Sequence, residues 1–224
     1  CIKTKKMNEE YFQELVDIYS KKEGDEFIID DPNKKIKYRL SIFRKNFPSD
    51  ESRDIFLSNI KKIENLTKYP GILPIIFVNQ QLPAIISEYT PNGTLHDYIE
   101  KHNNLTDTQK YIIIYGIVKT LLFLKIHHLY IEDLDSNQIY LNDHFYPQIS
   151  LTNFLMKGKI ETKWLLDPVY EFSDVAYEII TGKKPNHKTK EDVSDGIKID
   201  SIFQRKIIQN SWSNSRFLKQ GYQI

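Results

Sequence analysis

The chain has 224 residues, of which 40% are hydrophobic and 27% are charged, and its formal net charge is +1. This composition is ordinary for a globular protein, and the near-zero charge gives no support to a nucleic-acid partner. The one cysteine, Cys1, excludes an internal disulfide and favours a reducing, cytoplasmic location. No apolar run is long enough for a membrane-spanning helix, so we expect no membrane span.

The first part of the chain combines helical and strand patterns. Residues 7–22 have the apolar spacing of an amphipathic helix, for which packing on the domain is favoured over binding a partner. Two strands follow at residues 27–29 and 36–43, and the second alternates between apolar and polar residues. A helix from about residue 50 to Leu66 comes next. Two more strands are then expected, at residues 72–78 and 82–89.

The second part of the chain is mainly helical. Thr94 has the capping-box spacing that opens one helix. Thr106 and Gln109 have the same spacing and open another helix, which runs to about His127. This helix is so rich in Ile and Leu that we expect it to be buried on most sides.

Two short strands and a further helix complete the pattern. The strands are expected at residues 138–141 and 148–151, and the helix begins near Val169 and ends at Gly182. The chain is therefore predicted to be an α+β protein, rich in strands up to about residue 88 and mainly helical beyond it. A cleft between two such unlike lobes is the natural place for a ligand.

Four segments carry a resemblance to a known family. Residues 86–95, with the sequence ISEYTPNGTL, resemble the hinge and the first C-lobe helix of tyrosine-kinase-like protein kinases. Residues 127–141 fall where that family has its catalytic loop, and residues 142–150 resemble the approach to its D-F-G motif. Residues 169–185 resemble its long C-lobe helix and the turn that follows. The chain thus resembles a eukaryotic protein kinase domain.

The resemblance implies a single two-lobed domain over residues 25–224. A small β-rich N-lobe is expected over residues 25–88, and a larger, mainly helical C-lobe over residues 89–224. Residues 1–24 would form an N-terminal helical extension.

Most residues that a kinase uses for phosphoryl transfer are replaced in this sequence. Asp133 matches the catalytic aspartate of the family. Ser41 stands at the position of the anchoring lysine, and Asn59 at that of its glutamate partner. Glu132 replaces the catalytic-loop arginine, Gln138 the metal-binding asparagine and Leu151 the metal-binding aspartate. Without a carboxylate at position 151, a bound triphosphate would keep its charge largely uncompensated. A shifted register, in which Lys37 or Lys45 serves as the anchor, stays open.

The nucleotide site implied by the resemblance is altered as well. Arg39 matches a position beside the adenine ring where the family prefers a small residue, and Ser87, Glu88 and Tyr89 match the hinge. Arg39 either fills the adenine site or bends to solvent, and the sequence favours neither. The first hairpin contains no glycine-rich phosphate loop.

These replacements favour a pseudokinase, a kinase-like fold that acts as a signalling scaffold or an allosteric regulator of other proteins, such as an active kinase. Neither a cofactor nor a metal site is then expected. One alternative is a weak or unconventional ATP-dependent protein kinase that uses Asp133, and another is a nucleotide-binding switch. ATP and Mg²⁺ belong to these alternatives. The sequence leaves the partner and the oligomeric state open.

Overall fold

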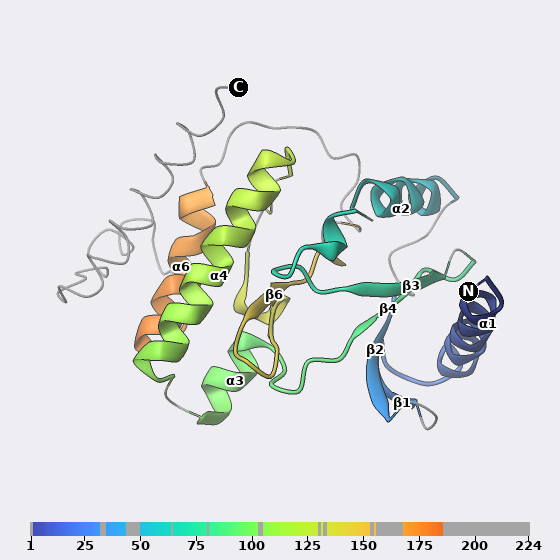
Figure 1. Cartoon of the computed structure of the whole chain (residues 1–224), viewed down its shortest axis with the longest axis horizontal. Coiled ribbons are helices and arrows are strands. Elements are labelled where there is room, and N and C mark those ends of the chain that lie inside the picture. Colours follow the sequence, from blue (N-terminus) through green and yellow to red (C-terminus); the bar gives the residue numbers. More distant parts are fainter. Residues whose placement is uncertain are drawn as a thin grey trace. The chain divides into compact units, whose positions relative to one another are not determined.

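The computed structural model describes most of the chain up to residue 185 (Figure 1). The described residues are 2–31, 35–43, 50–63, 65–79, 81–102, 105–129, 131, 134–152, 155 and 168–185. The chain divides into two compact units, the first formed by Cys1–Pro91 with Gln148–Glu161 and the second by Asn92–Pro147 with Thr162–Ile224. Helices accompany a small antiparallel sheet, so the predicted α+β class is confirmed.

The first unit is built on a four-stranded antiparallel sheet with the strand order β1-β2-β4-β3. Its elements are α1 (Ile2–Tyr19), β1 (Glu26–Asp31), β2 (Ile36–Ile42), α2 (Asp50–Ile63), the 3-10 helix η1 (Leu66–Lys68), β3 (Ile75–Asn79) and β4 (Ala84–Glu88). The two helices and the four strands expected here therefore exist, with ends that differ by a few residues.

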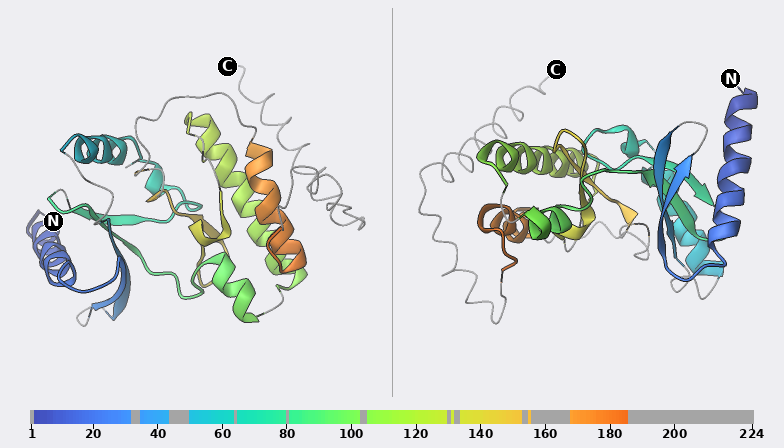
Figure 2. Two further views of the ribbon diagram at one scale, coloured as in Figure 1. Left: turned by 180° about the vertical axis from the view of Figure 1, so that it is seen from behind. Right: turned by 90° about the horizontal axis from the view of Figure 1, so that it is seen from below.

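The apolar and polar side chains of β2 alternate between the two faces of the sheet. Helix α1 covers one face of the sheet (Figure 2). Tyr38, Leu40 and Ile42 are buried on that face, where they meet Phe12 and Val16 in one apolar core. Since side chains alternate across a strand, the polar residues between them lie on the opposite face. Helix α1 is thus a packing helix, as its amphipathic pattern favoured.

The strand expected at residues 72–78 begins later than its apolar pattern indicates. Ile72 pairs instead with Ile149 in a parallel bridge, where the N–H of Leu73 donates to the Ile149 carbonyl at 3.0 Å. The N–H of Ile149 donates to the Gly71 carbonyl at 2.8 Å. Pro74 follows directly and has no N–H to give to a strand ladder. The backbone groups of Gly71 and Leu73 therefore bond to Ile149 and not to a neighbouring strand of the four-stranded sheet.

The second unit is mainly helical. Its elements are α3 (Leu95–His102), α4 (Asp107–Ile126), the 3-10 helix η2 (Ser136–Gln138), β5 (Ile139–Leu141) and α6 (Pro168–Thr181). Strand β6 (Pro147–Ile149) begins with the last residue of the stretch Asn92–Pro147, and its other two residues belong to the first unit. Helices α4 and α6 lie side by side (Figure 2), and Lys110 Nζ donates to the Ile180 carbonyl at 3.3 Å. None of the described helices is both long and apolar enough to cross a membrane.

The start of α4 follows the sequence closely. The N–H of Gln109 donates to the Thr106 hydroxyl at 3.2 Å, and the Gln109 side chain accepts from the N–H of Thr106 at 2.9 Å. This is the expected capping box, which satisfies two backbone donors that the first turn of a helix leaves free.

The burial expected for α4 is only partly right. The Ile and Leu residues of one face are buried, among them Ile113, Ile117 and Leu124. Tyr111, Tyr115 and Ile126, however, are 49%, 44% and 69% exposed. The apolar composition of a helix indicates that two of its faces can be buried. It does not indicate whether other elements of the protein cover both faces.

The C-terminal end of α4 turns through a non-glycine residue with positive φ. His128 has φ +57°, its N–H donates to the Lys125 carbonyl at 3.0 Å, and the N–H of Leu129 donates to the Leu124 carbonyl at 2.9 Å. These two bonds make a Schellman motif, in which glycine is the preferred residue at the His128 position.

We expect His128→Gly to raise the free energy of unfolding by about 0.5–1 kcal/mol, because glycine adopts this conformation without a steric penalty. Urea denaturation with an unchanged slope measures the difference. His127→Gly is the matched control: His127 has φ −88° and its ring lies 4.5 Å from Phe123, so this change should lower stability. A lower stability for both variants would contradict the prediction.

Candidate functional site

One face of the sheet brings together three of the residues singled out from the sequence. Arg39 lies opposite Ser87 on the neighbouring strand β4, and Ser41 lies opposite Ile85. Residues paired across two antiparallel strands share a face, so Arg39, Ser41 and Ser87 are neighbours. Ser41 and Ser87 are buried, with 8% and 6% exposure. Ser41 and Ser87 thus contribute uncharged hydroxyls to this face, beside the guanidinium of Arg39.

Arg39 does not extend freely into solvent. Its side chain is 14% exposed, and its Nη1 donates to Glu26 Oε2 on β1 at 3.0 Å. Glu26 is 57% exposed, and the energy of such a partly solvated ion pair is small. The pair nevertheless turns the guanidinium toward β1 and holds it along the sheet. Occupation of an adenine site by this side chain stays a prediction.

Leu151 and Leu155 lie in a buried corner of the first unit. Leu151 and Leu155 are 3% and 1% exposed, and the N–H of Leu155 donates to the Leu151 carbonyl at 3.2 Å. Asn59 on α2 is 1% exposed and its Nδ2 donates to the Leu155 carbonyl at 3.4 Å. Leu151 therefore belongs to the apolar core, and Asn59 is held by the same corner.

The expected hinge residues differ in their surroundings. Ser87 is buried, whereas Glu88 is exposed and its N–H donates to the Pro74 carbonyl at 3.1 Å. Tyr89 is half-buried, with the amino group of Lys37 5.8 Å from the centre of its ring. The backbone of this segment is thus fixed by the sheet.

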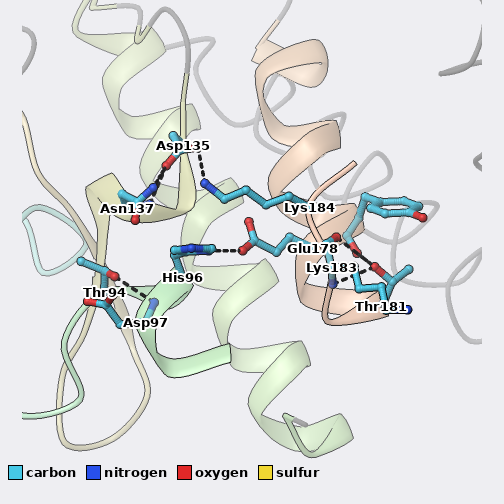
Figure 3. A network of polar contacts seen from close by, with 10 residues as sticks. Thr94, His96, Asp97, Asp135, Asn137, Glu178, Thr181, Lys183 and Lys184 are labelled. Atoms are coloured by element: carbon cyan, nitrogen blue, oxygen red, sulfur yellow. Dashed lines mark hydrogen bonds and ion pairs between the residues drawn. The ribbon is translucent and has the colours of Figure 1, made fainter. Parts of the chain in front are cut away.

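The second unit contains Gln138, the last residue of η2. This short helix is capped by Asp135, which accepts from the N–H of Asn137 at 2.8 Å and pairs with Lys184 at 3.0 Å (Figure 3). Burial alone would raise the pKa of Asp135, but the hydrogen bonds from Asn137 and the Lys184 ammonium outweigh it and lower the pKa below 3.8. This carboxylate therefore stabilises the fold above its unfolded pKa, and that contribution is lost as the pH falls through the folded pKa. Glu132 and Asp133 lie outside the described residues.

A hydrogen bond between a histidine and a buried glutamate joins α3 to α6 in the second unit. His96 Nδ1 lies 2.7 Å from Glu178 Oε1, and the side chains are 30% and 4% exposed (Figure 3). Sequence reasoning did not find this pair, because the two residues are 82 positions apart and neither belongs to a short motif. A glutamate on the inner face of a predicted apolar helix was the one signal that a partner was needed.

We expect His96→Ala to lower the free energy of unfolding by about 2–3 kcal/mol, because it leaves the buried Glu178 carboxyl without this hydrogen bond. Urea denaturation measures the loss, and His102→Ala, an exposed histidine on the same helix, should cost about 0.5 kcal/mol or less. The second change Glu178→Leu should recover most of the loss in the His96→Ala background. Equal costs for the two histidine variants would show that the hydrogen bond to Glu178 is not the cause.

No group of three or more His, Cys, Asp or Glu side chains that could hold a metal ion occurs in the part of the chain that the structure describes. Ser41, Asn59 and Gln138, the described polar residues at the positions matched to the anchoring lysine, its glutamate partner and the metal-binding asparagine, carry a hydroxyl and two amides. These groups can donate hydrogen bonds to a ligand, but none of the three is a carboxylate for a divalent cation.

Comparison with known proteins gives one distant relative. No protein-family model matches the chain. The L-type lectin-domain containing receptor kinase IX.2 of Arabidopsis thaliana is 23% identical over 213 residues, a region that covers 80% of this chain. The match spans 30% of that receptor kinase. The similarity is too low to establish a family.

Proposed function

We propose that the chain is a catalytically impaired protein-kinase-like domain, a pseudokinase that acts as a scaffold or an allosteric regulator of other proteins. The observation that carries the proposal is Leu151. It stands where the resemblance implies the principal metal-binding aspartate, and it is 3% exposed in an apolar corner. Phosphoryl transfer depends on metal ions that neutralise the phosphates, so this replacement removes a central part of the chemistry.

Two further positions support the same proposal. Ser41, matched to the anchoring lysine, is buried and carries no charge. Asn59, matched to its glutamate partner, donates to the Leu155 carbonyl. The loss of both charges is consistent, since either one alone would be a buried charge without its partner.

The relative lends partial support. A receptor kinase is similar in sequence to most of this chain, which favours a kinase-like origin for the fold. Its own name describes a lectin domain and a kinase, and the match covers less than a third of it. We propose only a kinase-like domain for this chain.

The experiment is a thermal denaturation of the purified chain with and without ATP, in Mg²⁺ and in EDTA, and we expect ATP to leave the midpoint unchanged in both buffers. A ligand at about 100 times its dissociation constant adds about 2.7 kcal/mol, which for a chain of this size raises the midpoint by about 5–10 °C. An active protein kinase in the same buffers is the positive control. A rise that requires Mg²⁺ would overturn the proposal in favour of a weak kinase, with phosphate transfer the next assay. A rise in EDTA as well would favour a nucleotide-binding switch.

A further inference from the structure

The outer face of α4 carries a stripe of apolar side chains that are exposed or half-buried in the part of the unit that the structure describes. Tyr111, Tyr115 and Ile126 are exposed, and Val118 and Leu122 are half-buried. We name these five residues the α4 stripe. The opposite face of α4 packs against α6. A helix that is apolar on two faces and partnered on one presents the second face for association.

The spacing of the α4 stripe is that of a helix–helix seam. Positions 111, 115, 118 and 122 alternate steps of four and three residues, the pattern by which apolar side chains stay on one line along a helix. The rings of Tyr111 and Tyr115 are stacked 5.9 Å apart with an angle of 6° between their planes. Lys119 places its amino group 5.4 Å from the centre of the Tyr115 ring. The aromatic part of the stripe is therefore ordered before any partner arrives.

Charges of opposite sign stand at the two ends of the α4 stripe. Asp107 is exposed in the first turn of α4 and Lys125 is exposed in the last turn. The two residues are five helical turns apart at 3.6 residues per turn, so they project from the same edge of the stripe. A surface with an acid at one end and a base at the other is complementary to a reversed copy of itself.

We propose that the α4 stripe is the contact surface of a homodimer in which the α4 helices of two copies lie antiparallel. A two-fold axis level with Gly116, midway between positions 107 and 125, sets Asp107 of each copy against Lys125 of the other. The same axis sets Tyr111 beside Leu122 of the second copy, and Tyr115 beside Val118. A parallel pair would instead place like charges together at both ends.

The dimer rests on α4 alone, so it holds or fails independently of the proposed function. A single helix pair gives an interface at the low end of the size range for specific complexes. We therefore expect a weak dimer, with a dissociation constant of about 10–100 µM, that forms as the protein concentration rises.

Sedimentation velocity of the whole chain over a concentration series tests the proposal. The wild type should move from monomer to dimer, and Asp107→Lys should weaken the dimer at least about tenfold by setting two lysines against each other. Adding Lys125→Asp to that variant should restore the wild-type constant to within about threefold. Lys61→Asp, an exposed charge reversal on α2, is the matched control and should change nothing. Thermal midpoints confirm that each variant is folded.

Disulfide cross-linking fixes the orientation of the two helices. In a Cys1→Ser background, Tyr115→Cys places the two thiols about 3 Å apart along the helix axis, whereas Tyr111→Cys separates them by about 15 Å. The first variant should cross-link on mild oxidation and the second should not, since a disulfide needs Cα atoms within about 7 Å. Cross-linking of both would indicate a parallel pair and overturn the proposal. A monomer at every concentration, or a charge reversal without effect, would also overturn it.

Discussion

Leu151→Asp should lower the free energy of unfolding by about 3–5 kcal/mol at neutral pH. Leu151 is 3% exposed and packs in the same corner as Leu155, so the new carboxylate would lose its water without gaining a cation or a hydrogen-bond donor built for it. The change introduces the residue type that the resemblance implies at this position, where the structure buries an apolar side chain. Urea denaturation at a fixed pH measures the difference.

The pH dependence separates the effect of charge from the effect of size. Burial would raise the pKa of the new carboxyl above its unfolded value of about 3.9, so the folded state would bind more protons than the unfolded state between the two values. Stability should then fall as the pH rises from about 4 toward neutrality. Leu151→Asn, with the same shape and no charge, should be destabilised without this pH dependence.

Two results would contradict this prediction. A Leu151→Asp protein as stable as the wild type, with a flat pH profile, would mean that the corner is open to water. A gain in stability on adding Mg²⁺ to the variant, absent with Leu151→Asn, would mean that a metal site survives around this position. Either result would weaken the observation on which the proposed pseudokinase function depends.

Local patterns predicted the elements whose signals lie within a few residues. The alternation of β2 gave its buried residues, the capping box at Thr106 gave the start of α4, and Gly182, with φ +72°, ends α6 where it was expected. Ile36 belongs to the alternating set but is 46% exposed, because it stands at the open end of the strand. Periodicity fixes the face of a residue, and position in the sheet fixes its burial.

Contacts between distant segments could not be predicted in this way. The bridge from Ile72 to Ile149 shortened an expected strand, and the bond from Asn59 to Leu155 gave that amide a partner 96 residues away. The pairing of His96 with Glu178 has the same character. The sequence therefore identified the residues of the candidate site. It did not identify the distant residues that contact several of their side chains.

Phe12→Ala should lower the free energy of unfolding of the first unit by about 3–5 kcal/mol. Phe12 is 5% exposed, and its ring packs edge-on against Tyr38 at 5.3 Å and beside Phe77 at 5.7 Å. Truncation removes the transfer energy of the ring and leaves a cavity that two strands of the sheet cannot easily fill. The loss should appear in urea denaturation as a lower midpoint with an unchanged slope.

Ile18→Ala is the matched control, because Ile18 is a large apolar residue on the same helix but is 46% exposed. It should cost less than about 1 kcal/mol, so that a difference between the two variants reports burial and not helix propensity. Equal and small costs would mean that α1 leaves the sheet easily. Dissociation of α1 would then expose Leu40 and Ile42, which are fully buried beneath it, to a partner. A large cost for Phe12→Ala alone makes α1 an integral layer of the first unit, and any partner must then bind elsewhere on that unit.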